Sequence, residues 1–344
     1  MRRATLKVVA GRGAVPAGQA VRSCFGRRAF TTAAASTEVK QKYDFINVED
    51  KGEVRWVSLN RPDTHNAFNE LVIGEITDAF RTIQRDAAQE KFRAVVLTGN
   101  GKSFSAGADL NWMKKMASYT QKENELDSHK LFDMFNSIYA CPMPVIGRIN
   151  GNAIGGGSGL VSACDFAFSV NKAVFGFTEV KLGLIPAVIS PFVMMKIGKG
   201  NCSRYFLTGE RFYATEATRL GLIQGSFETV EELDKAVDSV LTEIKANSPA
   251  AMRSCKQLIN NVYHSLGSPK KGEGLSDVKA PPPHLAPPLS LFVHHSCGAD
   301  DHLGPRSVPQ EQLASEIARI RVSKEGQEGL SAFLEKRKPS WIVS

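Results

Sequence analysis

NGNAIGGGSGLVSACD, residues 150–165, places four glycines within five positions, between a run typical of a strand and a run typical of a helix. Glycine lets the main chain approach a ligand closely. The start of a helix presents unpaired N–H groups and the positive end of its dipole. Such a turn can hold an oxyanion, although the same glycines could also serve only to pack a helix tightly against a strand.

Three other kinds of site also use glycine-rich turns, but the residue spacing of this turn does not match any of their motifs. The turn lacks the GxxxxGK[ST] pattern of a phosphate-binding loop and the GxGxxG pattern of a dinucleotide site. A serine-hydrolase elbow, G-x-S-x-G, would use Gly156 and Ser158, but Leu160 stands where the last glycine belongs. Binding of an oxyanion by main-chain N–H groups therefore remains the main hypothesis for this turn.

A second loop supports that hypothesis. GKSFSAGADLNWM, residues 101–113, follows the strand-like run RAVVLTG and offers small residues at 105–108, where a helix is predicted to begin. Two backbone N–H donors, from loops at the same ends of neighbouring strands, would form a two-donor oxyanion hole.

Strand and helix patterns alternate along the first two thirds of the chain, which predicts an α/β fold. Alternation and β-branched residues predict a hairpin from residues 43–49 and 52–60. The other predicted strands are residues 93–99, 144–151, 165–170 and 173–177, and the predicted helices are residues 69–87, 124–139 and 157–163.

From about residue 231 the pattern becomes helical, so residues 231–344 are predicted to form an α-helical C-terminal region, after a core at residues 43–230. The helical segments are 230–247, 248–265, 308–323 and 324–338. Residues 266–307 are rich in proline and glycine, and we expect a disordered insert or a segment that arose from a gene-model error. Their His294, His295, Cys297 and His302 lack the paired spacing of a zinc site, so no metal is predicted.

The chain of 344 residues carries a formal net charge of +8. The first 37 residues contain seven basic residues and no acid, which is typical of a mitochondrial transit peptide and predicts a matrix protein. Because these seven cations account for nearly all of the net charge, nucleic-acid binding is not favoured. No apolar run is long enough to span a membrane. The six cysteines form no CxxC pair and are interpreted as isolated thiols.

Seven motifs resemble the enoyl-CoA hydratase/isomerase, or crotonase, superfamily. They occur in family order over residues 43–264 and 308–341, and they are LNRPDTHNAFN, GKSFSAGADL, PVIGRINGNAIGGG, ACDFAF, FGFTEVKLGLIP, YFLTGERFYATEATRLGLI and EGLSAFLEKRKPSW. Within the family, FSAGADLNWM together with EVKLGLIPAVISPF looks most like the methylglutaconyl-CoA hydratase-type enzymes.

The resemblance implies a ClpP-like spiral of repeated ββα units, a C-terminal α-helical trimerisation region and a homotrimer or dimer of trimers. It also implies that the backbone N–H groups of Ala108 and Gly156 bind the thioester oxygen of an acyl-CoA as it becomes an enolate. No cofactor is implied, since coenzyme A is part of the substrate.

Proton transfer is where this chain departs from the family pattern. Well-known hydratases carry two glutamates, and here the first position is Gly159 while the second is Glu179. Glu179 is therefore the sole expected acid/base residue. A single carboxylate could serve a hydratase through a well-placed water, or a Δ3,Δ2-enoyl-CoA isomerase. A noncatalytic acyl-CoA-binding or RNA-associated member is a further alternative.

The resemblance also assigns substrate contacts. Ala67 and the loop of Ala106, Gly107, Ala108, Asp109 and Leu110 are expected along the coenzyme A moiety, while Phe333 and Lys336 are expected near the acyl pocket or the phosphates. Asp109 could equally act as a helix cap.

Overall fold

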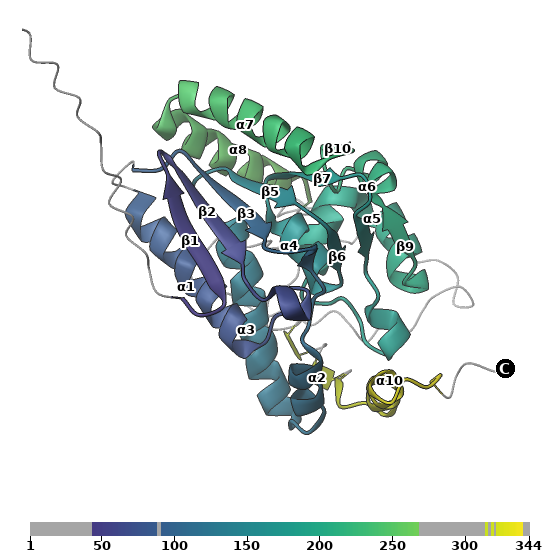
Figure 1. The fold of residues 1–344 in the computed structure, drawn as a ribbon. Helices are drawn as coiled ribbons and strands as arrows, with labels where there is room; N and C mark the ends of the chain where they lie inside the picture. Colours follow the sequence, from purple (N-terminus) through teal and green to yellow (C-terminus); the bar gives the residue numbers. More distant parts are fainter. Residues whose placement is uncertain (1–42, 88–90, 268–313, 316–317, 320, 340–344) are drawn as a thin grey trace, which may run out of the picture. The chain divides into compact units, whose positions relative to one another are not determined.

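The computed structural model describes residues 43–87, 91–267, 314–315, 318–319 and 321–339 (Figure 1). The predicted transit peptide and nearly all of the predicted insert lie outside the described residues.

Two sheets build the core. The larger has the order β1-β2-β3-β5-β7-β10, in which β1 and β2 form an antiparallel hairpin and every other pairing is parallel. Its strands are β1 (Ile46–Lys51), β2 (Val54–Leu59), β3 (Ala94–Gly99), β5 (Val145–Ile149), β7 (Phe166–Val170) and β10 (Gly225–Phe227). The smaller has the order β4-β6-β8-β9, with β4 (Ser103–Ser105), β6 (Asn152–Ile154), β8 (Val174–Gly176) and β9 (Arg211–Tyr213).

The chain runs repeatedly from a strand of the larger sheet to a strand of the smaller sheet and then into a helix. The units β3-β4-α2, β5-β6-α4 and β7-β8-α5 follow this path, with β3, β5 and β7 adjacent and parallel in one sheet and β4, β6 and β8 adjacent in the other. Because equivalent loops then stack on one another, the turns after β4 and β6 are neighbours. The predicted spiral of ββα units and the predicted hairpin are confirmed.

The helices cover these sheets. Figure 1 shows α1 and α3 lying against each other and α7 beside α8, with α7 packed on β5, β7 and β10. All six residues of β3 are buried, so the middle of the larger sheet is core. The helices are α1 (Glu70–Asp86), α2 (Leu110–Ala117), α3 (Gln121–Tyr139), α4 (Gly156–Ala163), α5 (Ser190–Thr208), α6 (Ala214–Leu220), α7 (Val230–Ala246), α8 (Pro249–Gly267) and α10 (Lys324–Leu334), with 3₁₀ helices η1 (Pro62–Thr64) and η3 (Glu179–Leu182).

Helix α5 was not expected from the sequence, and α10 ends earlier than the pattern suggests. The periodicity of α5 is interrupted at Gly198, whose φ of 73° kinks the helix. Helix α10 stops at Leu334 because Lys336 adopts a left-handed conformation, with φ of 56°. The N–H of Arg337 then bonds the carbonyl of Ala332 at 2.9 Å, closing the helix with a Schellman turn.

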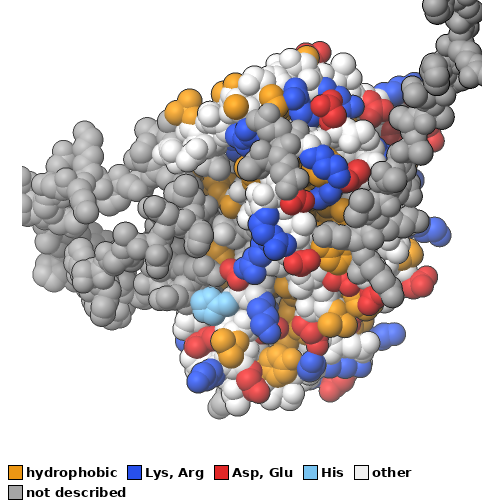
Figure 2. Space-filling view, turned by 90° about the vertical axis from the view of Figure 1, so that its left-hand side faces the viewer, with side chains coloured by type: hydrophobic (Ala, Val, Ile, Leu, Met, Phe, Trp, Pro, Cys, Tyr) orange, Lys and Arg blue, Asp and Glu red, His pale blue; other side chains and the backbone are white. Residues whose placement is uncertain are grey.

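Charge is mixed on the surface that Figure 2 displays, where lysine and arginine side chains alternate with aspartate and glutamate instead of gathering into a single patch. None of the helices that the structure describes has the length and apolar content to cross a membrane. Within the described ranges, no three or more histidine, cysteine, aspartate or glutamate side chains cluster in a way that could hold a metal ion.

Candidate active site

A cavity of about 1080 Å³ opens where the turns after β4 and β6 meet η3, α2 and α10. Nine of the ten residues predicted for the site line it: Ala67, Ala106, Ala108, Asp109, Leu110, Gly156, Glu179, Phe333 and Lys336. The tenth, Gly107, lies where the two turns touch. The structure thus brings together segments that are up to about 270 residues apart in the chain.

The N–H of Ala108 is free to bind a ligand because of how its loop pairs with Phe68. The carbonyl of Gly107 accepts the N–H of Phe68 at 2.8 Å, and the N–H of Asp109 donates to the carbonyl of Phe68 at 3.0 Å. In an extended segment successive N–H groups point to opposite sides, so the N–H of Ala108 points away from Phe68. No acceptor for it exists among the described residues.

The N–H of Gly156 is the second free amide. Gly156 is the first residue of α4, where intrahelical acceptors are absent by geometry. The neighbouring Gly155 N–H bonds the carbonyl of Gly176, but that of Gly156 finds no acceptor in the part of the chain that the structure describes. A Cβ at Gly156 would lie 2.4 Å from Phe68 Cζ, so only glycine fits there.

Gly107 brings the two amides together. Its φ is +84°, and a Cβ there would lie 2.6 Å from the Ile154 carbonyl oxygen and 3.2 Å from the Gly156 nitrogen. The turn that carries Ala108 therefore packs directly on the turn that carries Gly156. Two free N–H groups on one cavity wall can stabilise an oxyanion.

Glu179 begins η3 and faces these turns. Its Oε1 lies 3.3 Å from the place where a Cβ of Gly155 would stand, and its Oε2 is buried without a hydrogen-bond partner among the described residues. Burial raises the pKa of Glu179 to about 7, against a weaker opposing bond from its own backbone N–H. A carboxyl with this pKa can both accept and donate a proton near neutral pH.

Because burial raises the pKa of Glu179, ionisation of this residue lowers the free energy of unfolding. Between pH 4.5 and 7 the folded protein holds the Glu179 proton more strongly than the unfolded chain does, so stability falls as pH rises through that window. Above pH 7 the full penalty is on the order of 3 kcal/mol. We expect Glu179→Gln to raise the free energy of unfolding in urea by about that amount at pH 8.5 and to change it little at pH 4.5. An equal difference at both pH values would contradict the assigned burial of the carboxyl.

The resemblance places the first family glutamate at Gly159, and in the structure apolar side chains fill the space in front of this residue. A Cβ at Gly159 would lie 2.4 Å from Ile189 Cγ2 and 3.0 Å from Phe135 Cε1. A glutamate therefore does not fit without repacking. The other two carboxylates on the cavity wall are Asp63 and Asp109.

A side chain at Gly159 would overpack the core, and Gly74, where there is room for a side chain, provides the control. We expect Gly159→Ala to lower the free energy of unfolding by about 1 to 3 kcal/mol. Gly74→Ala in α1, where a Cβ meets no atom within 4 Å, should instead stabilise by about 0.5 to 1 kcal/mol. Urea unfolding of both variants checks this, and a Gly159→Ala variant as stable as the wild type would show that Ile189 moves freely.

Asp109 lines the cavity but already has partners for both oxygens. Its Oδ1 caps α2 by accepting the N–H of Asn111 at 2.8 Å, and its Oδ2 pairs with Arg61 at 3.0 Å. These contacts hold the start of α2 beside Ala108. The geometry thus favours the capping interpretation, while the side chain of Asn111 remains on the cavity wall.

Helix α10 closes one side of the cavity and carries Phe333. A Cβ at Gly329 would lie 2.1 Å from the Leu182 carbonyl oxygen, so the helix packs on η3 at backbone distance. Phe333 is 45% exposed, which leaves part of its ring available to a ligand. Lys336 sits on the rim just after the helix.

Ser158 has no nucleophilic role in this geometry. The residue is fully buried, and its Oγ donates to the Ala153 carbonyl at 2.6 Å.

The sequence analysis gave no site role to three further cavity residues, Trp112, Leu131 and Arg321. No motif marks Leu131 or Arg321, whereas Ile189, which also lines the cavity, lies in the motif EVKLGLIPAVISPF. The one available signal is for Trp112, which follows the oxyanion loop by a single helical turn and would be expected on the same wall.

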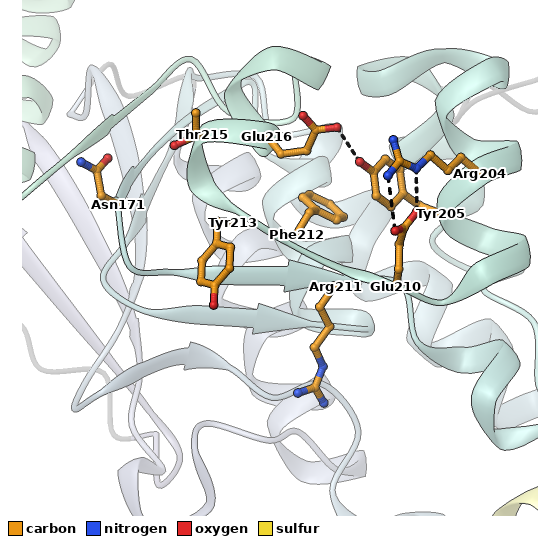
Figure 3. Close-up of a pocket in the computed structure, with 9 residues that line it drawn as sticks. All are labelled: Asn171, Arg204, Tyr205, Glu210, Arg211, Phe212, Tyr213, Thr215 and Glu216. Carbon is orange, nitrogen blue, oxygen red and sulfur yellow. Dashed lines mark hydrogen bonds and ion pairs between the residues drawn. The ribbon is translucent and has the colours of Figure 1, made fainter.

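A second hollow, of about 670 Å³, lies around β9 and the start of α6. Figure 3 shows Arg204 paired to Glu210, at 2.6 Å, and the Tyr205 hydroxyl donating to Glu216, while Arg211 makes no hydrogen bond or ion pair with the other residues drawn. It shares only Arg211 with the main cavity.

Comparison with known proteins agrees with this geometry. A "Short-chain-enoyl-CoA hydratase" of Clostridium acetobutylicum is 33% identical over 217 residues, which cover 62% of this chain and 80% of that protein. The Dictyostelium discoideum protein named "Probable enoyl-CoA hydratase, mitochondrial" is 28% identical over 313 residues, or 89% of this chain and 96% of that protein.

The solved structure of an enoyl-CoA hydratase from Shewanella pealeana superposes with a TM-score of 0.63 at 34% identity, covering 88% of this chain and 97% of that chain. The sequence pattern of the family described as Enoyl-CoA hydratase/isomerase matches residues 49–273. The chain belongs to the enoyl-CoA hydratase/isomerase family.

Proposed function

We propose that this protein hydrates a short-chain 2-enoyl-CoA of the branched, 3-methylglutaconyl-CoA type. One observation carries the proposal: the backbone amides of Ala108 and Gly156, which have no acceptor among the described residues, share a cavity with Glu179, and burial raises the pKa of Glu179 to about 7. The motifs FSAGADLNWM and EVKLGLIPAVISPF support the branched substrate, and the names of the relatives support hydration.

The proposed reaction uses main-chain donors for charge and one side chain for protons. The amides of Ala108 and Gly156 bind the thioester oxygen and stabilise the negative charge that develops as water adds to C3. Ionised Glu179 takes a proton from the attacking water and passes it to C2, which returns the carboxylate to its starting state. The water contributes OH to C3 and H to C2, so the product is a 3-hydroxyacyl-CoA.

Isomerisation of a 3-enoyl-CoA is the second candidate, and the surroundings of Gly159 favour it. Ile189 and Phe135 fill the space where a second carboxylate would activate water, whereas moving a proton between C4 and C2 needs only Glu179. A noncatalytic acyl-CoA-binding or RNA-associated role is disfavoured by the intact amides and Glu179.

A substrate panel separates these functions. The purified protein is incubated with 3-methylglutaconyl-CoA, crotonyl-CoA and a 3-enoyl-CoA. Added water is followed by mass spectrometry, and the conjugated isomer, which has the same mass as the 3-enoyl-CoA, is followed by its ultraviolet absorbance. Hydration predicts a gain of one water on the 2-enoyl substrates. Conversion of the 3-enoyl-CoA to its conjugated isomer, with no hydrated product from the others, would establish the isomerase instead, and no turnover of any substrate would establish the noncatalytic role.

The proposed setting is the mitochondrial matrix, and the proposed assembly is a homotrimer or a dimer of trimers. The basic, acid-free residues 1–37 and the name of the Dictyostelium discoideum relative support the first. Exposed Leu258 and Ile259 on α8, at 61% and 67%, support a partner surface on the C-terminal helices.

A further inference from the structure

Two buried N–H donors without acceptors lie on the wall of the main cavity. Trp112 is 2% exposed, and its Nε1 has no hydrogen-bond partner among the described residues. Arg321 also lines the cavity, and its Nε is buried and equally without a partner in the described part of the chain. Much of the wall around them is apolar, formed by Met113, Met116 and Leu131. Buried donors without acceptors are rare, and at a cavity they indicate a ligand oxygen.

These donors connect to the oxyanion turns through Phe68. The Phe68 ring packs directly on Gly156, and its centroid lies 6.4 Å from that of Trp112. Trp112 approaches the carboxyl of Asp127 without reaching hydrogen-bonding geometry, and Asp127 pairs with Arg321. A thioester held by the two amides therefore shares its cavity with Trp112 and Arg321.

Among the described residues, the guanidinium of Arg321 finds hydrogen-bond partners for only one of its nitrogens. Its Nη1 donates to Asp127 Oδ2 and to Ser128 Oγ, both at 3.3 Å. Neither Nε nor Nη2 donates to any described residue. The edge formed by Nε and Nη2 is the one that holds a carboxylate side-on with two parallel hydrogen bonds.

The same chain shows this arrangement complete at Arg55. There Nε and Nη2 hold Asp50 side-on at 2.7 and 3.1 Å, while Nη1 lies 3.7 Å from a second carboxylate, Asp86. One arginine thus sits between two carboxylates. At Arg321 the carboxylate of Asp127 bonds Nη1, and no carboxylate of the described residues lies side-on against Nε and Nη2.

We infer that Arg321, aided by Trp112, binds a carboxylate at the far end of the acyl chain and so selects 2-enoyl thioesters that carry one. This inference rests on the proposed function and adds the group that sets its specificity. The ion pair with Asp127 keeps the Arg321 guanidinium oriented. When a substrate without a carboxylate is bound, Nε and Nη2 of Arg321 stay buried without an acceptor, which is unfavourable. Selectivity arises because only the carboxylated chain supplies the missing acceptor.

The test compares 3-methylglutaconyl-CoA with 3-methylcrotonyl-CoA, which has the same branched skeleton without the carboxylate. The wild type should prefer the carboxylated substrate in kcat/KM by at least about 100-fold. Arg321→Gln should lose about 100-fold on 3-methylglutaconyl-CoA, which is about 2.7 kcal/mol, and change less than 3-fold on 3-methylcrotonyl-CoA. Arg321→Lys, which keeps the charge but not the side-on pair, should fall between them.

Arg81→Gln is the matched control, because it removes an exposed arginine that pairs with Asp133 and does not line the cavity. It should keep the wild-type preference and the wild-type kcat/KM on both substrates. Equal losses on both substrates in Arg321→Gln, no loss on either, or a preference for 3-methylcrotonyl-CoA in the wild type would overturn the inference while leaving hydration intact. Absence of hydration by the wild type would instead remove the proposed function.

Discussion

Glu179→Gln is expected to lower kcat for hydration by about 10³- to 10⁴-fold while acyl-CoA binding stays within a few fold of the wild type. The reason is that Glu179 faces the amide turns, whereas the other two carboxylates on the cavity wall are Asp63, on the rim helix η1, and Asp109, whose oxygens are already engaged. Glutamine keeps the shape of the side chain but cannot exchange the proton. Initial rates with the best substrate of the panel, and calorimetric binding of the same acyl-CoA, measure the two effects.

Glu243→Gln on the exposed side of α7 serves as the control for this substitution and should leave turnover unchanged. A Glu179→Gln enzyme that retains even a tenth of wild-type kcat would remove Glu179 from proton transfer. The site would then have to use water alone.

Ala108→Pro is expected to lower kcat by about 10²- to 10³-fold, which is the usual effect of losing one oxyanion donor. Proline removes the N–H. Because that N–H bonds no described residue in the fold, its removal breaks no structural hydrogen bond, and the loss should fall on the transition state. Steady-state kinetics on the same substrate, with a thermal melt to verify folding, provide the measurement.

The control at this position is Ala108→Gly, which keeps the amide and adds no atom. It should stay within a few fold of the wild type. If Ala108→Pro folds and turns over as fast as Ala108→Gly, the N–H of residue 108 does not bind the oxyanion.

The sequence was sufficient to predict the amide part of the site because that part depends on local backbone rules. Gly156 follows a strand and begins a helix, and the small residues around Ala108 show the same arrangement in the preceding unit, so two turns with free N–H groups could be anticipated. Parallel pairing of β4 with β6 then follows from the repeated ββα units and places the turns together. Local pattern therefore predicted the α/β class and two turns able to bind an oxyanion, while the spiral of ββα units and the roles of Ala108 and Gly156 came from the family resemblance.

The acyl end of the cavity could not be predicted in the same way. Trp112 and Arg321 are separated by more than 200 residues, and no sequence pattern shows that both line one cavity near Asp127. The partners of Arg321 are on α3, a helix whose apolar spacing gives no sign of a buried ion pair. The filling of the space before Gly159 by Ile189 likewise depends on α5 and the turn before it, which the sequence pattern did not reveal.

The central claim is that two main-chain amides polarise the thioester carbonyl beside one acidic side chain. Isotope-edited infrared spectroscopy tests it on Glu179→Gln, which binds the substrate without consuming it. With ¹³C at the thioester carbonyl of crotonyl-CoA, the bound carbonyl stretch should fall to lower frequency than in water, and the added substitution Ala108→Pro should reverse much of that change. A bound carbonyl whose frequency equals the value in water, in a variant that demonstrably binds the substrate, would contradict the account.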